Sequence, residues 1–157
     1  MFQSDLLKGR TILITGGGTG LGRSMALRFG ELGANIFLVA RREEPLKETA
    51  EAIRAKGARA AYASADIRDF SAVEKAVEAA EKEFGRVDTL VNNAAGNFIA
   101  RTEKLSPNAF NAVVGIVLQG TFFCTLAITR AVAMNSATTM RTGITVQASS
   151  TWLLPYT

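Results

Sequence analysis

Short runs of apolar residues alternate along the chain with longer segments in which apolar residues recur every three or four positions. A short apolar run is typical of a buried β-strand, and the longer period is typical of an amphipathic helix. The predicted strands are Thr11–Thr15, Asn35–Ala40, Arg59–Ser64, Val87–Val91 and Ile144–Ala148. Strands that alternate with helices indicate βαβ units. We therefore predict the α/β class, with a doubly wound parallel sheet.

The helical segments carry start and stop signals of their own. Met25, Phe29 and Leu32 share one face of the first helix, which Gly33 ends. The other predicted helices run from about Glu44 to Lys56, from Ser71 to Phe84, and from Ser106-Pro107 to about Ala133. Ser71 and Glu74 have the spacing of a capping box, so we expect Ser71 to cap the third helix.

Length and composition predict one soluble domain, residues 1–157. Apolar residues make up 48% of the chain and charged residues 20%, a globular balance. We see no apolar run long enough for a membrane span, and Met1 to Arg10 do not resemble a secretory signal. We therefore expect no membrane partner, and a cytoplasmic location or a mitochondrial or peroxisomal matrix.

Charge, cysteine and histidine content exclude several kinds of site. The net charge is +4, but basic residues are mixed with acidic ones, as in Arg41-Arg42-Glu43-Glu44. This mixing favours a phosphate-bearing small molecule over nucleic acid. Cys124 is the only cysteine and lies in an apolar segment, and histidine is absent. We expect a buried structural thiol and no metal site.

A glycine-rich turn, Gly16–Gly22, separates the first strand from the first helix. Glycines allow positive φ and close backbone approach, and a helix N-terminus presents free N–H groups to a pyrophosphate. Because a strand precedes this turn and a helix follows it, the turn predicts dinucleotide binding on a Rossmann-type fold.

Arg41 and Arg42 stand about twenty residues further on, where NAD-binding proteins place an acid for the ribose 2′-hydroxyl. Guanidinium groups suit a 2′-phosphate, so we expect NADP(H) as the cofactor. The alternative is that the two arginines begin a solvated loop and pair with Glu43 or Glu44.

Four motifs in order resemble the short-chain dehydrogenase/reductase family. They are Thr15-Gly16-x-x-x-Gly20-x-Gly22, Asp66-Ile67 after the third strand, Asn92-Asn93-Ala94-Ala95-Gly96 after the fourth, and Ser149-Ser150 after the fifth. The resemblance implies the following cofactor-binding residues: Gly16, Thr19, Gly20, Leu21, Arg41, Arg42, Asp66, Ile67, Asn93, Ala94 and Gly96.

Two adjoining segments, Asn92–Ile99 and Leu105–Ala109, are similar to the 2,4-dienoyl-CoA reductase branch of that family. Such reductases pass a hydride from NADPH to an unsaturated fatty acyl-CoA. The resemblance implies that Phe98 and Ile99 border an acyl site in an enzyme of fatty acid metabolism, with an acyl-CoA as the substrate.

The sequence departs from the family at the expected catalytic residues. No Tyr-x-x-x-Lys element is present, and Trp152 stands where the dienoyl-CoA branch carries a tyrosine. Gln119 replaces an asparagine on the long helix. Ser150 is therefore the best catalytic candidate, with Gln119 and Trp152 as its neighbours, and the chain alone is not expected to be active.

The family also continues with C-terminal strands and helices that this chain lacks, so the resemblance implies either a portion of a longer reductase or a short relative without catalysis. Two further functions stay open: a non-catalytic NADP(H)-binding or interaction module, and an oxidoreductase for 3-oxoacyl-thioesters or steroids. The apolar helix segment Phe110 to Ile128 suggests contact with a second subunit in a homo-oligomer, or burial within the chain's own core.

Overall fold

A computed structural model describes residues 3, 5–97, 100–135 and 144–147, and only the backbone of residues 135 and 144–147. The strands form one parallel sheet in the order β3-β2-β1-β4-β5. Their bounds are β1 Thr11–Thr15, β2 Asn35–Ala40, β3 Ala60–Ser64, β4 Thr89–Asn92 and β5 Ile144–Gln147. The predicted α/β class and the parallel Rossmann-type sheet are confirmed.

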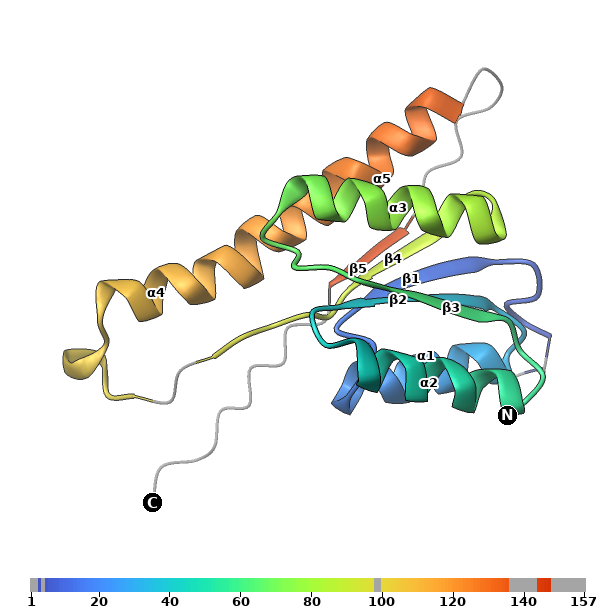
Figure 1. Ribbon diagram of the computed structural model, residues 1–157, viewed down its shortest axis with the longest axis horizontal. Coiled ribbons are helices and arrows are strands. Elements are labelled where there is room, and N and C mark those ends of the chain that lie inside the picture. Colours follow the sequence, from blue (N-terminus) through green and yellow to red (C-terminus); the bar gives the residue numbers. More distant parts are fainter. Residues whose placement is uncertain (1–2, 4, 98–99, 136–143, 148–157) are drawn as a thin grey trace.

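Helices cover both faces of the sheet (Figure 1). They are α1 Gly20–Glu31, α2 Glu43–Ala55, α3 Phe70–Phe84, the short 3₁₀ turn η1 Thr102–Lys104, α4 Pro107–Val114, the π-helical turn η2 Gly115–Gly120, and α5 Thr121–Asn135. Helices α1 and α2 lie on one face, and α3 and α5 lie on the other. The sheet is thus doubly wound, as the alternating pattern predicts.

Two hydrophobic clusters form the core, one on each face of the sheet. Successive strand side chains point to opposite faces, so Leu13 and Phe37 belong to the α3 and α5 side while Ile12 and Ile36 belong to the α1 and α2 side. Each of these four side chains is at most 3% exposed. Burial on both faces explains why β1 and β2 are continuously apolar.

The cap of α3 differs from the predicted one. The N-cap residue is Asp69, whose carboxylate accepts hydrogen bonds from the backbone N–H groups of Ser71 and Ala72. Ser71 already lies inside the helix, so the expected capping box from Ser71 to Glu74 is wrong. An aspartate two residues earlier is at least as good an N-cap as serine, and it sets the start of the helix.

The segment Pro107–Met134 is one continuous helix built from α4, η2 and α5. Ser106 caps it by accepting the Ala109 N–H at 3.1 Å. Among the described residues this is the one helix long and apolar enough to cross a membrane by length and composition alone, which corrects our sequence-based statement. Polar residues interrupt the apolar run of this helix, but nearly all of them are uncharged. The mean hydropathy of the helix therefore stays in the range of a membrane-spanning segment.

The same long helix is only partly covered. Its second half packs on α3 and β4, where Cys124 and Ala127 are buried. Leu118 and Phe122 are exposed, and α4 extends beyond the sheet (Figure 1). The expected contact with a second subunit through Phe110 to Ile128 stays a prediction.

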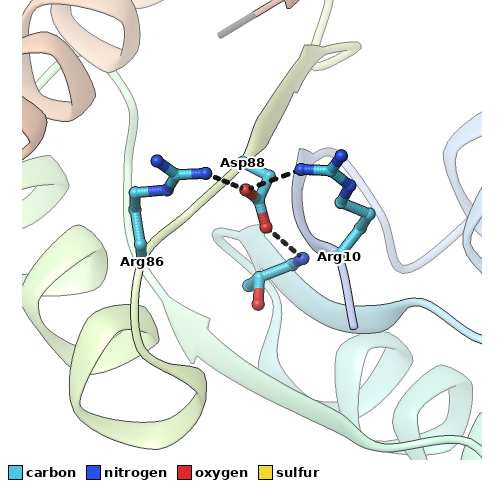
Figure 2. A network of polar contacts seen from close by, with 4 residues as sticks. Arg10, Arg86 and Asp88 are labelled. Atoms are coloured by element: carbon cyan, nitrogen blue, oxygen red, sulfur yellow. Dashed lines mark hydrogen bonds and ion pairs between the residues drawn. The ribbon is translucent and has the colours of Figure 1, made fainter. Parts of the chain in front are cut away.

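The amino ends of β1 and β4 are joined by Asp88 (Figure 2). Its carboxylate accepts the Thr11 backbone N–H at 3.0 Å and lies 2.5 Å from Arg86 and 3.4 Å from Arg10. Partial burial raises the pKa of Asp88, but the Thr11 N–H and the two guanidinium groups outweigh it and hold the pKa below its ordinary value. The charged network lies at the amino ends of the strands, whereas the site described next lies at their carboxyl ends.

Candidate functional site

A cleft of about 600 Å³ opens at the carboxyl ends of β1, β2 and β4. It is lined by Gly16, Gly18, Thr19, Leu21, Ala40, Arg41, Arg42, Pro45, Ala65, Asp66, Ile67, Asn93, Ala94, Ala95 and Ile116. Open parallel sheets bind ligands at the carboxyl ends of their strands. The volume of the cleft lies within the usual range for small-molecule sites.

The glycine turn lies against the segment that follows β4. Gly16 has φ +67°, and a Cβ there would lie 2.9 Å from Asn93 Nδ2 and 3.0 Å from Ala94 Cα. A Cβ on Gly22 would overlap Gly16 O and Asn93 Nδ2. Both positions require glycine, because Asn93 lies against the turn and leaves no room for a side chain.

Thr15 and Asn93 fix the turn to β4 through a set of hydrogen bonds. The Thr15 hydroxyl accepts the backbone N–H groups of Asn93 and Ala94, both at 3.0 Å, and donates to Val91 O at 3.4 Å. In return the Asn93 side-chain amide donates to Thr15 O at 3.0 Å and to Gly16 O at 3.3 Å. The backbone at the floor of the cleft is therefore held rigidly.

The N-terminus of α1 borders the cleft and is suited to an anion. Thr19 occupies the N-cap position, yet its side chain makes no capping hydrogen bond, and the first turn holds no acidic residue. The first N–H groups of a helix have no partner within the helix and carry partial positive charge. A pyrophosphate placed over this turn would satisfy these donors.

Arg41 and Arg42 follow β2 on the wall of the cleft. Both are exposed, and within the described part of the chain neither guanidinium group makes a hydrogen bond or an ion pair. The alternative pairing with Glu43 or Glu44 is therefore absent. The two positive groups are available to an anionic ligand at the end of the cleft next to β2.

Asp66 and Ile67 follow β3 and complete the same wall. Hydrogen bonds from Arg68 lower the pKa of Asp66, partial burial opposes them, and the nearby charge of Arg41 lowers it further. The carboxylate is thus ionised at neutral pH. Ile67 packs under the long helix, since a Cβ on Gly120 would lie 2.5 Å from Ile67 Cδ1.

The predicted cofactor residues largely converge on this cleft. The lining includes Gly16, Thr19, Leu21, Arg41, Arg42, Asp66, Ile67, Asn93 and Ala94. Gly20 begins α1 beside it, and Gly96 lies against Ile116, whose Cδ1 would be 2.6 Å from a Cβ there. That these residues bind a cofactor stays a prediction, but the glycine cradle and the free arginines fit an NADP(H) dinucleotide.

Of the three predicted catalytic residues, the structure describes only Gln119. Gln119 is exposed on η2 and does not line the cleft. Ser150 and Trp152 lie outside the described residues, as does Phe98.

Sequence reasoning missed several residues of the site. Ala40, Ala65, Ala95 and Ile116 line the cleft without any polar signal in the sequence. The first three could have been found from their place at or just after a predicted strand end. Ile116 could not, because it comes from the long helix, and only the packing of η2 against the segments that follow β3 and β4, at Ile67 and Gly96, brings it to the cleft.

A family model described as short chain dehydrogenase matches residues 10–152. The chain belongs to the short-chain dehydrogenase family. The matched residues include the glycine turn, the arginine pair, the Asp66-Ile67 step and the Asn92–Gly96 segment, so the family and the cleft agree.

Curated proteins named 2,4-dienoyl-CoA reductase are similar to this chain. A protein named probable 2,4-dienoyl-CoA reductase of Bacillus subtilis is 45% identical over 77% of this chain and 48% of its own length. A peroxisomal 2,4-dienoyl-CoA reductase of Arabidopsis thaliana is 42% identical over 77% of this chain and 41% of its own length. The chain spans about half the length of the curated relatives it matches.

A solved dehydrogenase structure shares the architecture. The citronellol catabolism dehydrogenase AtuB of Pseudomonas aeruginosa superposes with a TM-score of 0.78 and 34% identity, over 83% of this chain and 54% of that one. The fold described above is therefore shared with that dehydrogenase over the portion common to the two chains.

Proposed function

We propose that this short-chain dehydrogenase is an NADP(H)-dependent reductase that acts on an unsaturated fatty acyl-CoA. The observation that carries the cofactor part is the pair of unpaired arginines, Arg41 and Arg42, on the cleft wall just after β2. A guanidinium group binds phosphate strongly, and a 2′-phosphate is the feature that distinguishes NADP(H) from NAD(H).

The substrate part of the proposal rests on the relatives. Proteins named 2,4-dienoyl-CoA reductase share 45% and 42% identity with this chain, each over 121 residues. Bound NADPH supplies the hydride. The protein's own contribution would be to hold the dinucleotide with the glycine turn and the α1 N-terminus, in a cleft that Asn93 and Ile116 also line.

Two alternatives belong to the test. One is a module that binds NADP(H) without hydride transfer, and the other is an oxidoreductase that acts on 3-oxoacyl-thioesters or steroids. Neither is favoured by a contact in the described residues. A cytoplasmic or matrix location, with an acyl-CoA as the small-molecule partner, is part of the same proposal.

The test begins with cofactor binding. The purified chain is titrated with NADPH and, separately, with NADH, and nicotinamide fluorescence reports binding. We expect tighter binding of NADPH, and loss of that preference in the double variant Arg41→Gln/Arg42→Gln. Arg59→Gln is the matched control, because Arg59 pairs with Glu83 and does not line the cleft. Equal affinity for both nucleotides in the unaltered chain would contradict the NADP(H) assignment.

The second step addresses the reaction. A 2,4-dienoyl-CoA is added to the NADPH complex, and cofactor oxidation is followed by the loss of nicotinamide absorbance. Oxidation supports the reductase. Binding without oxidation by this chain and by a chain extended to the length of its relatives would favour the non-catalytic module. If NADPH is oxidised only when a 3-oxoacyl-thioester or a steroid is added, the result would favour an oxidoreductase for those substrates.

A further inference from the structure

Arg68 holds the carboxylate of Asp66 with a two-pronged hydrogen bond. Its Nε lies 3.0 Å from Oδ1 and 3.1 Å from Oδ2, and its Nη2 lies 2.5 Å from Oδ2. The Arg68 backbone N–H also donates to Asp66 Oδ1 at 3.0 Å. A side chain two residues away thus uses both oxygens of the acid, which is the strong bidentate geometry.

The two partners occupy different places relative to the cleft. Asp66 lines it, together with Arg41 and Arg42, whereas Arg68 is not among the lining residues. The stem of Arg68 lies over Gly115, where a Cβ would be 3.6 Å from Arg68 Cδ. Arg68 is therefore held from outside the cleft by the start of η2, with its guanidinium group turned to Asp66.

Charge makes this arrangement relevant to the ligand. Among the described lining residues Asp66 is the one acid, and its charge is close enough to Arg41 to interact with it. An uncompensated carboxylate on this wall would attract Arg41 and repel a 2′-phosphate. Paired with Arg68, Asp66 no longer cancels the charge of the arginine pair.

We propose that Arg68 is a specificity-determining residue for NADP(H): it neutralises Asp66 from outside the cleft and so leaves Arg41 and Arg42 available to the 2′-phosphate. This inference rests on the proposed function, because it concerns the same cofactor site. Arg68 is a positioning residue in this role and need not touch the dinucleotide.

The measurement is the ratio of the dissociation constants for NADH and NADPH, obtained by fluorescence titration of the full chain at low salt. Arg68→Gln should reduce the NADPH preference about three- to ten-fold, the effect of one unit charge several ångströms away in partly screened surroundings. Arg68→Lys keeps the charge and should retain most of the preference. Arg59→Gln, the control arginine, should leave the ratio unchanged.

A second variant separates this role from a direct contact. In Arg68→Gln/Asp66→Asn the uncompensated charge is gone, so the ratio should return to within about two-fold of the unaltered chain. A ratio that stays low in the double variant would overturn the proposal, because Arg68 would then act on the phosphate itself. An unchanged ratio in Arg68→Gln would overturn it as well.

These outcomes are distinct from failure of the proposed function. If the unaltered chain prefers NADPH and Arg68→Gln does not change that preference, only the role of Arg68 is contradicted. If the unaltered chain shows no preference for NADPH, the cofactor assignment fails and the inference fails with it. Melting curves of each variant confirm that the titrated protein is folded.

Discussion

The hydroxyl of Thr15 accepts the backbone N–H of Asn93 at 3.0 Å, while the side chain of Asn93 donates to the Thr15 carbonyl at the same distance. The two residues stand at the ends of neighbouring strands, 78 positions apart in the chain. Their reciprocal bonds join the glycine turn to the segment after β4. The shape of the cleft floor therefore depends on this pair.

Thr15→Val should destabilise the protein by about 2 kcal/mol, because the N–H groups of Asn93 and Ala94 would lose their shared acceptor. Thr15 is 1% exposed, so water cannot readily replace the hydroxyl. Thr15→Ser keeps the oxygen and should cost clearly less. The measurement is the free energy of unfolding in urea. Equal losses for the two variants would show that packing, not the hydroxyl, is what matters at this position.

Gly22→Ala should abolish detectable NADPH binding, because a Cβ there would overlap Gly16 O and Asn93 Nδ2. The turn would have to open, and the backbone that faces the pyrophosphate would move with it. Ser24→Ala, on the exposed side of the same helix, is the control and should bind normally. The readout is the fluorescence titration with NADPH. Normal binding by Gly22→Ala would refute this view of the turn.

Acidification should remove the contribution of Asp88 to stability. The pKa of Asp88 is lower in the folded protein than its ordinary value of 3.8, so the charged form favours folding. That contribution is present above the ordinary pKa and is lost as the pH falls through the lower folded value. Asp88→Asn should therefore cost about 1 kcal/mol at pH 7, and the difference should shrink toward pH 3.

The check on Asp88 is urea unfolding of both proteins between pH 7 and pH 3, with Glu48→Gln on the exposed side of α2 as the control. The control should track the unaltered chain at every pH. A constant difference between Asp88→Asn and the unaltered chain would mean that the ionised carboxylate is not what stabilises the amino ends of β1 and β4.

Cys124 should resist alkylation while the protein is folded. Burial raises the pKa of its thiol to about 12, and the side chain is 3% exposed, so the reactive thiolate is both rare and covered. Iodoacetamide labelling at pH 8, followed by mass spectrometry, should be at least about a hundred-fold slower in the native protein than in urea. Comparable rates would show that α5 opens easily from α3 and β4.

The sequence predicted the parts of this protein that follow from local physics. The continuous apolar runs of β1 and β2 predicted that both faces of these strands are buried. The glycines between a strand and a helix predicted a turn that can bind a phosphate group. The residues just after the strands, such as Arg41 and Asn93, could be assigned to one edge because parallel strands end together.

Two features depended on competing local contacts: the cap of α3, which was predicted wrongly, and the pairing of Arg41 and Arg42, which the sequence left open. Both Asp69 and Ser71 can cap α3, and the carboxylate of Asp69 is the one that reaches the free N–H groups. Arg41 and Arg42 could have paired with the adjacent glutamates, yet neither pairing forms. The choice in each case depends on side-chain direction, which the residue pattern does not contain.

The sequence by itself determined how strands and helices follow one another along the chain, where the glycine turn lies, and which residues stand at the strand ends. Each of these depends on neighbours in the chain. The tertiary structure alone decided which groups meet across long separations. Asn93 reaches Thr15, Ile116 reaches the cleft, and the stem of Arg68 lies over Gly115. The order of the strands within the sheet and the packing of the helices set those distances.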